Sequence, residues 1–266
     1  MGQPVEVRFL SSAPFFYMQI KFLGTSAGWP LPRLGCKCEI CSSNDPKDKR
    51  TRSQLLINET LLIDIGPDTY LHLSDSKIDP TKIKYAAITH EHSDHTFGLW
   101  DLGHIYKSQK INVILAELTY KKISRLFFYN EYKVTKIKAE ESIKMDNLSV
   151  TLLPVNHTDS SFGILMKQKN KSVFYAPDFK SIPDATINKL RDLDLAILDG
   201  SELKIATLTH KPIEENFKLG KKLKMKKVYF THLGHRTLPH QKLERYVQKE
   251  GGESFHIPHD GLEIKL

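Results

Sequence analysis

Short apolar runs separated by polar turns recur along the chain, and they predict a regular succession of strands and helices. In the first half, QLLINETLLIDIG (54–66) predicts a hairpin that turns at Asn58-Glu59. Single strands are expected in three further runs: QIKFLG (19–24), KYAAITH (84–90) and INVILAE (111–117). Helices are expected from Asp68 to Asp75 and over ELTYKKISRLFFYNEY (117–132). A third helix is expected to begin near residue 90 and to run through Leu99, Trp100 and Leu102.

The second half repeats this pattern. Strands are expected in LSVTLLPVNH (148–157), LDLAILDG (193–200) and KKVYFTH (226–232), and a hairpin around Lys169-Asn170-Lys171 is expected in FGILMKQKNKSVFYAPD (162–178). Helices are expected from Ile213 to Leu223 and over LPHQKLERYVQKEG (238–251). The final run, LEIKL (262–266), is expected to close one edge of a sheet. This mixture of strands and helices predicts an α/β fold.

Five residues with metal-binding or acid–base side chains share one position, the carboxyl end of a predicted strand: His90, His157, Asp178, Asp199 and His232. Proteins of the α/β class bind ligands at the edge where their strands end. We therefore expect these side chains to meet at one edge of a sheet. No Gly/Ser-rich linker or low-complexity stretch divides the pattern, so a single domain is expected over residues 18–266, after an extension at residues 1–17.

Composition and charge narrow the classes of function. The 266 residues include 40% hydrophobic residues, enough for a real core, and no apolar run reaches the roughly 18 residues of a membrane span. Glu6, Arg8 and Pro14 interrupt the first 17 residues, which do not resemble a signal peptide, so a cytoplasmic protein without a membrane partner is expected. The net charge of +8 suits an anionic substrate or a nucleic acid. However, much of this charge lies in the lysine-rich segment 218–230, which favours a solvated face over a nucleic-acid site.

The segment ITHEHSDHTFGL (88–99) places three histidines and an aspartate within six residues. Adjacent imidazoles and carboxylates gain little at a surface, and a bound metal ion is the usual reason for their convergence. His90 and His92 lie two apart just past a strand and can reach one ion. Asp94 and His95 are placed to reach a second ion a few ångströms away. Further ligands are expected at other strand ends: His157, Asp178 and His232.

All three cysteines fall in GCKCEIC, as Cys36, Cys38 and Cys41. A disulfide would leave one cysteine over, in a compartment expected to be reducing. Three thiolates suit a tetrahedral zinc ion with a fourth ligand, and we favour His235 because the turn in THLGH can direct it and His232 to different sites. Such a closed site would be structural. Three reduced cysteines without a metal are the alternative.

These motifs resemble those of the metallo-β-lactamase superfamily of metal-dependent hydrolases. The resemblance rests on THEHSDH, on the later strand-end ligands and on LLIDIGPD, and it covers nearly everything from Met18 to Leu266. It implies a four-layer αββα sandwich with two mixed sheets. It also implies the ligand sets: His90, His92 and His157 for one ion, Asp94, His95 and His232 for the other, Asp178 bridging both, and Asp64 orienting a ligand histidine. Antibiotic-hydrolysing relatives usually carry a cysteine in place of Asp178, so antibiotic hydrolysis is not expected.

A narrower resemblance follows from the cysteine trio after FLGTSAGWP together with THLGH. These motifs resemble those of the cyclic-phosphate phosphodiesterases of the carbon–phosphorus lyase (phosphonate) pathway. That family carries a histidine upstream of its last ligand histidine, and His210 stands at the matching position, 22 residues before His232. The resemblance implies a catalytic His210, whereas a place beside the start of the helix near Pro212 is the alternative. The ending PHDGLEI is also similar, although His259 stands where an aromatic residue is more common.

The expected protein is a dinuclear metal-dependent phosphodiesterase that hydrolyses small, in particular cyclic, phosphodiesters with a hydroxide bridging the ions. Asp178 and His210 are its expected catalytic residues. Two Zn²⁺ or Mn²⁺ ions are the expected active-site cofactors, and one structural Zn²⁺ is expected at the cysteines. The expected partner is a small phosphodiester substrate rather than nucleic acid. The sequence does not identify the natural substrate, the physiological metal or the oligomeric state. A homodimer is compatible with it.

Three alternatives stay open. A tRNA 3′-processing endonuclease of the same superfamily suits the basic charge, but it usually inserts a long arm where only 21 positions here separate His157 from Asp178. Proteins of pyrroloquinoline quinone biosynthesis share the cysteine trio but tend to be longer. A non-catalytic, metal-stabilised binding protein would hold the ligands without a working acid, and His210 speaks against it.

Overall fold

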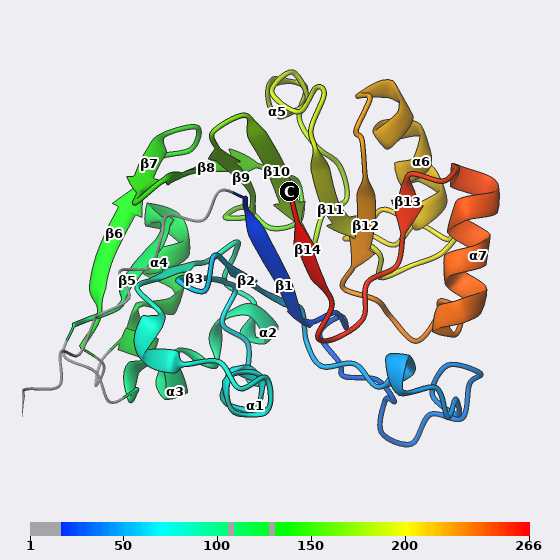
Figure 1. Cartoon of the computed structure of the whole chain (residues 1–266), viewed down its shortest axis with the longest axis horizontal. Helices are drawn as coiled ribbons and strands as arrows, with labels where there is room; N and C mark the ends of the chain where they lie inside the picture. Colours follow the sequence, from blue (N-terminus) through cyan, green and yellow to red (C-terminus); the bar gives the residue numbers. More distant parts are fainter. Residues whose placement is uncertain (1–16, 106–108, 128–130) are drawn as a thin grey trace, which may run out of the picture.

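Two β-sheets packed face to face form the centre of the computed structural model, which describes residues 17–105, 109–127 and 131–266 (Figure 1). The first sheet has the strand order β14-β1-β2-β3-β4-β5-β6. Its strands are β1 (Gln19–Gly24), β2 (Gln54–Ile57), β3 (Leu61–Ile63), β4 (Tyr85–Ala87), β5 (Asn112–Ala116), β6 (Lys133–Ile137) and β14 (Glu263–Lys265). Pairing is antiparallel from β14 to β3 and parallel from β3 to β6.

The second sheet has the order β13-β12-β11-β10-β9-β8-β7. Its strands are β7 (Ser142–Met145), β8 (Leu148–Pro154), β9 (Phe162–Gln168), β10 (Lys171–Ala176), β11 (Leu195–Asp199), β12 (Val228–Thr231) and β13 (Phe255–His256). Pairing is parallel from β10 to β13 and antiparallel from β7 to β10, so both sheets are mixed.

Helices cover the outer face of each sheet. Beside the first sheet lie α1 (Thr69–Asp75), α2 (Ser93–Thr96), α3 (Leu99–Gly103) and α4 (Glu117–Ile123); beside the second lie α5 (Asp184–Ile187), α6 (Ile213–Lys222) and α7 (His240–Gly251) (Figure 1). This arrangement is the αββα sandwich expected from the sequence, and the α/β fold class is confirmed. In the described part of the chain, no helix combines the length and the apolar character needed to cross a membrane.

The apolar runs are continuous because the strands are buried on both faces. In β10, Val173 and Tyr175 point into the core between the sheets, whereas Phe174 and Ala176 pack under the outer helices. Successive side chains of a strand point to opposite faces, so both positions of the alternation must be apolar here. Each sheet is thus fixed from two sides, which gives its strand ends a rigid base.

The hairpin turns and most strands are where the sequence predicts them. Asn58 and Glu59, in the three-residue connection between β2 and β3, both have positive φ, 49° and 59°, and the Thr60 amide donates to the Ile57 carbonyl oxygen at 3.1 Å to close the turn. The prediction of a single helix after KYAAITH is wrong in detail, because the structure has two separate helices there, α2 and α3. Gly98 lies between them, where an added Cβ would be 2.1 Å from the Gly66 carbonyl oxygen. This close approach needs glycine, and the helix is interrupted because the Gly98 amide donates to the Ile65 carbonyl oxygen at 2.8 Å instead of to the preceding turn.

The other differences concern weakly patterned segments. Three strands were not predicted, β6, β7 and β13, and the first two carry exposed lysines at sheet-edge positions. The helix expected over residues 117–132 is shorter: α4 ends at Ile123 and a 3₁₀ turn continues from Ser124 to Phe127. Residues 1–16 of the predicted N-terminal extension, and the last turns of this helix at 128–130, lie outside the described residues.

Candidate metal centre

Seven side chains from the ends of four strands meet at one edge of the sandwich, and we call them the rim cluster: His90, His92, Asp94, His95, His157, Asp178 and His232. They follow β4, β8, β10 and β12 along the chain. Ligand atoms of His90, His92, His157 and Asp178 all lie within 4.8 Å of one another, and so do those of Asp94, His95, Asp178 and His232. The two groups share Asp178, as the sequence resemblance implied.

Individual distances show how tightly these groups converge. His92 Nδ1 lies 3.0 Å from His90 Nε2 and 3.2 Å from His157 Nε2. In the other group, His95 Nε2 lies 3.1 Å from Asp94 Oδ2. Asp178 connects the groups, with Oδ2 3.3 Å from His90 Nε2 and 3.0 Å from His95 Nε2. Nitrogens of separate imidazoles this close together are stabilised when one cation lies between them.

Buried polar atoms of the rim cluster that lack hydrogen bonds also indicate a cation site. His95 Nε2, His232 Nδ1 and Asp178 Oδ1 are buried and lie as little as 2.8 Å from one another or from a neighbouring carboxylate, yet none of them makes a hydrogen bond of acceptable geometry with a described residue. An unpaired buried polar atom is costly and rare in folded proteins. A divalent cation would contact all of these atoms at once, so the residues present fit a metal centre.

The electrostatics of the rim cluster also favour positive charge at this place. Burial lowers the pKa of His232, but the carboxylates of Asp178 and Asp94 outweigh it and raise the pKa to about 10. Burial likewise lowers the pKa of His95, and Asp94 and Asp64 raise it well above its usual range. Protons on these imidazoles therefore take the place of the cations that the carboxylates would otherwise bind.

A second layer of hydrogen bonds fixes which ring nitrogen each histidine presents. Asp64 Oδ2 lies 2.8 Å from His95 Nδ1, and the Thr89 hydroxyl lies 2.9 Å from His90 Nδ1. His157 Nδ1 lies 3.0 Å from the Thr209 carbonyl oxygen. Each of these three rings therefore directs Nε2 into the cluster, and such outer contacts are usual for metal-ligating histidines.

Asp64 is itself held by several donors. It accepts hydrogen bonds from the Thr89 amide and hydroxyl at 2.9 and 2.8 Å and from the Tyr175 hydroxyl at 3.3 Å. Its φ is 59°, and His232 has a φ of 58°, both in the left-handed region that non-glycine residues seldom occupy. Backbone strain of this kind tends to gather at functional sites, where surrounding contacts maintain it.

His210 lies beside the rim cluster and is paired with a buried carboxylate. Its Nδ1 is 2.9 Å from Asp199 Oδ2 and 3.8 Å from Asp178 Oδ1. The Asp199 carboxylate also accepts hydrogen bonds from the Phe179 amide and from the Ser201 amide and hydroxyl. Helix α6 begins three residues later, at Ile213, with Pro212 as its N-cap. The side chain of His210 thus contacts Asp199, which the sequence placed at a strand end without assigning it a role.

The sequence also gave no role to Glu91, which lies between two rim-cluster histidines. Its carboxylate accepts hydrogen bonds from Lys122 of α4 at 2.7 Å, from the Ser160 hydroxyl at 2.5 Å and from the Thr158 hydroxyl at 3.0 Å. These contacts connect the loop after β4 to the loop that carries His157. The extended backbone just past the strand was a signal, because successive side chains there point to opposite sides and Glu91 must point away from the histidines on either side of it.

A cavity of about 580 Å³ opens over the rim cluster. Its floor includes Asp178, His210 and His232. Trp29 and Phe97, 62% and 58% exposed, line the same cavity and present aromatic surface to solvent. The cavity can therefore admit a small molecule to the cluster from solvent.

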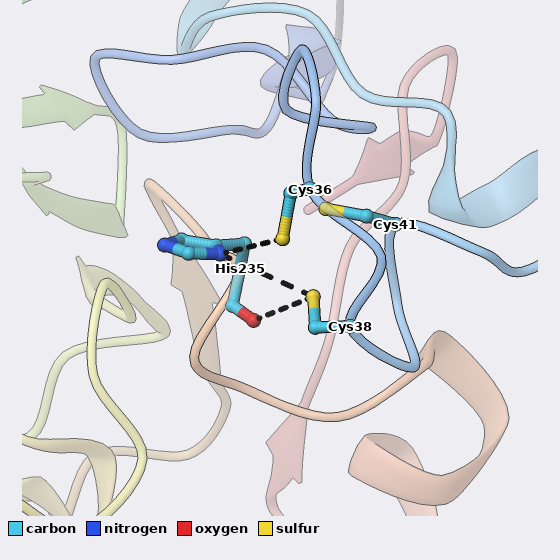
Figure 2. Close-up of side chains that lie close together, drawn as sticks. All are labelled: Cys36, Cys38, Cys41 and His235. Carbon is cyan, nitrogen blue, oxygen red and sulfur yellow. Dashed lines mark hydrogen bonds between the residues drawn. The ribbon is translucent and has the colours of Figure 1, made fainter.

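A second cluster, the cysteine cluster, consists of Cys36, Cys38, Cys41 and His235. Its ligand atoms lie within 4.8 Å of one another, and the cysteines are not paired as a disulfide. Figure 2 shows the three sulfurs turned toward one another, with His235 Nδ1 facing them; Nδ1 lies 3.3 Å from Cys36 Sγ and 4.0 Å from Cys38 Sγ. Hydrogen bonds from Cys38, and then from His235, lower the pKa of Cys36 to about 6, whereas burial raises the pKa of Cys41 to about 11. Three sulfurs and one imidazole are the donor set of a tetrahedral zinc site.

The fold and the rim cluster together define a class of protein: a metal-dependent hydrolase built on the αββα sandwich. Residues 59–233 match the family model of the β-lactamase superfamily domain, and the chain belongs to this family. The superfamily resemblance inferred from the sequence motifs is thereby confirmed.

Solved structures share this fold over nearly the whole chain. A diphosphatase from the PhnP family is 28% identical and superimposes with a TM-score of 0.84, covering 94% of this chain and 97% of its own. This match supports the narrower resemblance to the cyclic-phosphate phosphodiesterases. Zn²⁺-bound PqqB from Methylobacterium extorquens, 20% identical, has a TM-score of 0.81 over 93% of this chain and all of its own, and shares the fold.

Among curated proteins, an octanoyltransferase from Porphyromonas gingivalis is 26% identical over 260 residues. The alignment covers 92% of this chain but 51% of that relative. The chain therefore spans about half the length of this curated relative.

Proposed function

We propose that the protein is a dinuclear metal-dependent phosphodiesterase that acts on small phosphodiesters. His90, His92 and His157 would hold one divalent ion, and Asp94, His95 and His232 the other. Asp178 carries this proposal, because its two oxygens lie within 3.3 Å of His90 and 2.8 Å of His232, one ligand from each set. One carboxylate that faces both sets is what a bridging ligand requires.

Two divalent ions bound there would supply Lewis acidity for a phosphoryl oxygen and would lower the pKa of a water molecule toward neutrality. Zinc and manganese both suit histidine and aspartate ligands. The chain's own residues provide the orientation. Asp64, Thr89 and the Thr209 carbonyl oxygen fix the ligand rings before any substrate arrives. Preorganised polar groups of this kind need not rearrange during the reaction.

His210 would donate a proton to the leaving alkoxide. Asp199 holds its Nδ1 at 2.9 Å, so Nε2 is the nitrogen that can hold a proton toward a substrate in the cavity. Burial lowers the pKa of His210, but Asp199 outweighs it and raises the pKa above the usual value for histidine. A histidine that stays protonated near neutral pH suits an acid for a poor leaving group.

The cysteine cluster would hold a structural Zn²⁺. Cys36, Cys38 and Cys41 belong to the long connection between β1 and β2, whereas His235 follows β12 in the other sheet. An ion shared by them would fasten this connection to the turn that follows the ligand His232. All four coordination positions would be filled, which leaves none for a substrate.

The short connection between His157 and Asp178 and the charge of the cavity favour a small anionic substrate over precursor tRNA. Residues between His157 and Asp178 form mainly the hairpin of β9 and β10, so the described chain has no room there for an RNA-binding arm. Two divalent ions and the carboxylates Asp94 and Asp178 would leave the floor of the cavity positively charged, which suits the anionic group of a phosphodiester. The PhnP-family relative is named as a diphosphatase, so a phosphoanhydride should be tested beside diesters.

Turnover of bis(p-nitrophenyl) phosphate by the protein loaded with Mn²⁺ or Zn²⁺ tests the proposal. We expect hydrolysis. His210→Ala should lower kcat by about 10²–10³-fold with a cyclic alkyl phosphodiester, whose alkoxide leaving group needs an acid, and much less with bis(p-nitrophenyl) phosphate, whose nitrophenolate leaves without one; the metal content should not change. His104→Ala, which removes an exposed histidine that does not line the cavity, is the matched control. Absence of hydrolysis with every small diester and with diphosphates would overturn the proposal, and activity confined to precursor tRNA would support the endonuclease instead.

A further inference from the structure

Arg33 lies at the mouth of the cavity, between the two clusters. Its Nη1 is 3.2 Å from His235 Nε2, and its guanidinium carbon is 5.4 Å from the centre of the Trp29 ring. Its backbone amide donates to Cys41 Sγ at 3.3 Å, which ties its position to the cysteine cluster. Arg33 also lines the cavity that contains His210 and His232. One side chain therefore contacts a residue of the cysteine cluster and faces the candidate active site.

The three arginines of the cavity differ in their partners. Arg52 forms an ion pair with Asp68 at 3.0 Å, and Arg236 forms one with Glu202. Across residues 17–105, 109–127 and 131–266, no carboxylate lies within ion-pair distance of Arg33. Its partners are an aromatic face and an imidazole, and neither neutralises its charge. Arg33 is thus the arginine of this cavity with charge available for an anion.

The contact with His235 depends on where the imidazole carries its proton. A guanidinium can only donate, so Nε2 of His235 must accept with its lone pair, and the ring proton is then on Nδ1, facing the sulfurs. Figure 2 shows Nδ1 on the side of the sulfurs and Nε2 on the opposite side of the ring. A metal ion held by the three sulfurs and Nδ1 would use the Nδ1 lone pair, and the neutral ring would then carry its proton on Nε2. Nε2 and Arg33 would both be donors, and their hydrogen bond could not persist.

We propose that metal binding at the cysteine cluster releases Arg33 from His235, and that the freed guanidinium binds an anionic oxygen of the substrate in the cavity. This inference rests on the proposed function, because it takes the substrate to be a phosphate ester. Trp29 keeps the guanidinium at the mouth of the cavity through its ring face. The Arg33 amide stays tied to Cys41, so the side chain can turn toward the cavity without moving its backbone. The cysteine cluster then sets the affinity of the neighbouring site as well as the stability of its loop.

Binding of inorganic phosphate to the fully metal-loaded protein, measured by isothermal titration calorimetry, tests this coupling without turnover. We expect Arg33→Ala and Cys36→Ser each to weaken phosphate binding by about 10-fold, within the usual range of coupling between two sites. The double variant should bind no more weakly than either single variant, because both changes remove the same contact. Lys37→Ala, which removes an exposed positive charge from the same loop, should leave the affinity within about 2-fold.

Losses that multiply in the double variant, or unchanged affinity in Arg33→Ala, would overturn the inference. Collapse of the loop in Cys36→Ser would weaken phosphate binding in the Arg33→Ala background as well, so it would be recognised by the multiplied loss. Turnover of diesters with normal phosphate binding in Arg33→Ala would contradict the inference alone, whereas absence of turnover with the coupling intact would contradict the proposed function alone.

Fluorescence of Trp29 provides a second readout. The chain has two tryptophans, so Trp100→Phe leaves Trp29 as the single reporter. Addition of Zn²⁺ to protein whose rim cluster is already loaded should change its emission, because the guanidinium moves relative to the ring. The same titration with Arg33→Ala added should give less than about one third of this change. An equal change in both proteins would show that Zn²⁺ acts on Trp29 without Arg33, and would overturn the release step.

Discussion

The rim cluster and the cysteine cluster both gather metal-ligand side chains, but the fold supports them differently. His90, His95 and Asp178 of the rim cluster are at most 3% exposed; His90 and Asp178 follow strands that are packed from both sides, and His95 lies in α2. The cysteines are partly exposed and lie in a connection of 29 residues, 25–53, that contains no named strand. The rim cluster is therefore preorganised by the sandwich, whereas the geometry of the cysteine loop would depend more on the metal ion that its side chains are proposed to bind.

This difference separates the consequences of losing a metal. Loss of the two proposed ions from the rim cluster would remove chemistry but leave the strand ends in place, since the core between the sheets does not involve these residues. Loss of the proposed ion from the cysteine cluster should free a segment of the loop while the sheets remain intact. The catalytic rate should therefore respond to substitutions in the rim cluster, whereas the stability of the loop and the affinity for an anionic substrate should respond to substitutions of the cysteines.

The largest effect is expected from Asp178→Asn. The amide has the same shape but no charge, so one ligand shared by both sets would be weakened. We expect kcat/KM to fall by at least about 10³-fold, which corresponds to about 4 kcal/mol of transition-state stabilisation. Metal content measured by mass spectrometry should fall below two ions at the rim cluster, while the circular dichroism spectrum stays unchanged. Asp184→Asn, an exposed aspartate of α5, is the control, and equal activity in the two variants would contradict the role of Asp178.

A pH profile sharpens the distinction between binding and acid catalysis. The proposed acid His210 works when it is protonated, and Asp199 raises its pKa. The rate should therefore hold to a higher pH than an isolated histidine would allow and should fall as pH rises through this raised pKa. Asp199→Asn should shift that falling limb to lower pH, with a loss of about 10-fold or more at pH 8. A limb that stays in place would assign it to a group other than His210.

Sequence patterns identified most of the fold and most of both clusters. Strands such as β3 and β11 were predictable because burial on both faces makes them almost continuously apolar. The ligands of the rim cluster were predictable because short spacing and strand ends bring them together. Asp199 stood at a predicted strand end and Glu91 stood inside the motif HEHSDH, but their roles depend on partners from distant elements. Lys122 and Ser160, for example, contact Glu91 from α4 and from the loop after β8, and no local pattern in the sequence encodes those contacts.

A smaller effect is expected from Asp64→Asn, which changes the support of the rim cluster rather than a proposed ligand. Asp64 accepts from the Thr89 amide and hydroxyl and lies 2.8 Å from His95 Nδ1. Loss of its charge should lower metal affinity by about 10–100-fold, as is typical for second-layer partners. Competition with a chromophoric chelator measures this affinity. Added metal should restore most of the activity, and a variant that stays inactive at saturating metal would place Asp64 in the chemistry itself.

The smallest effect on kcat, and the most local effect on structure, is expected from Cys38→Ser, whose effect on the reaction should be limited to substrate affinity. The loop has anchors besides the proposed ion: the Asp48 carboxylate accepts from the His240 amide at the start of α7 at 2.7 Å, and Arg50 is fully buried. Opening should therefore be confined to residues near 33–45, where most side chains are exposed or partly exposed. We expect the melting temperature to fall by about 4–8 °C, the equivalent of about 2 kcal/mol for a chain of this size.

Limited trypsin digestion followed by mass spectrometry would locate the opening in this variant. Cleavage should become faster at Lys37 and at Arg33, while the sheets stay resistant. Cys41→Ser should behave in the same way, because each change removes one sulfur from the same donor set. Ser42→Ala, at an exposed position of the same loop but outside that set, should leave both the melting temperature and the cleavage rate within error. Uniform cleavage across both sheets would mean that the cysteine cluster supports the whole sandwich, and would remove the contrast between a preorganised rim and a metal-dependent loop.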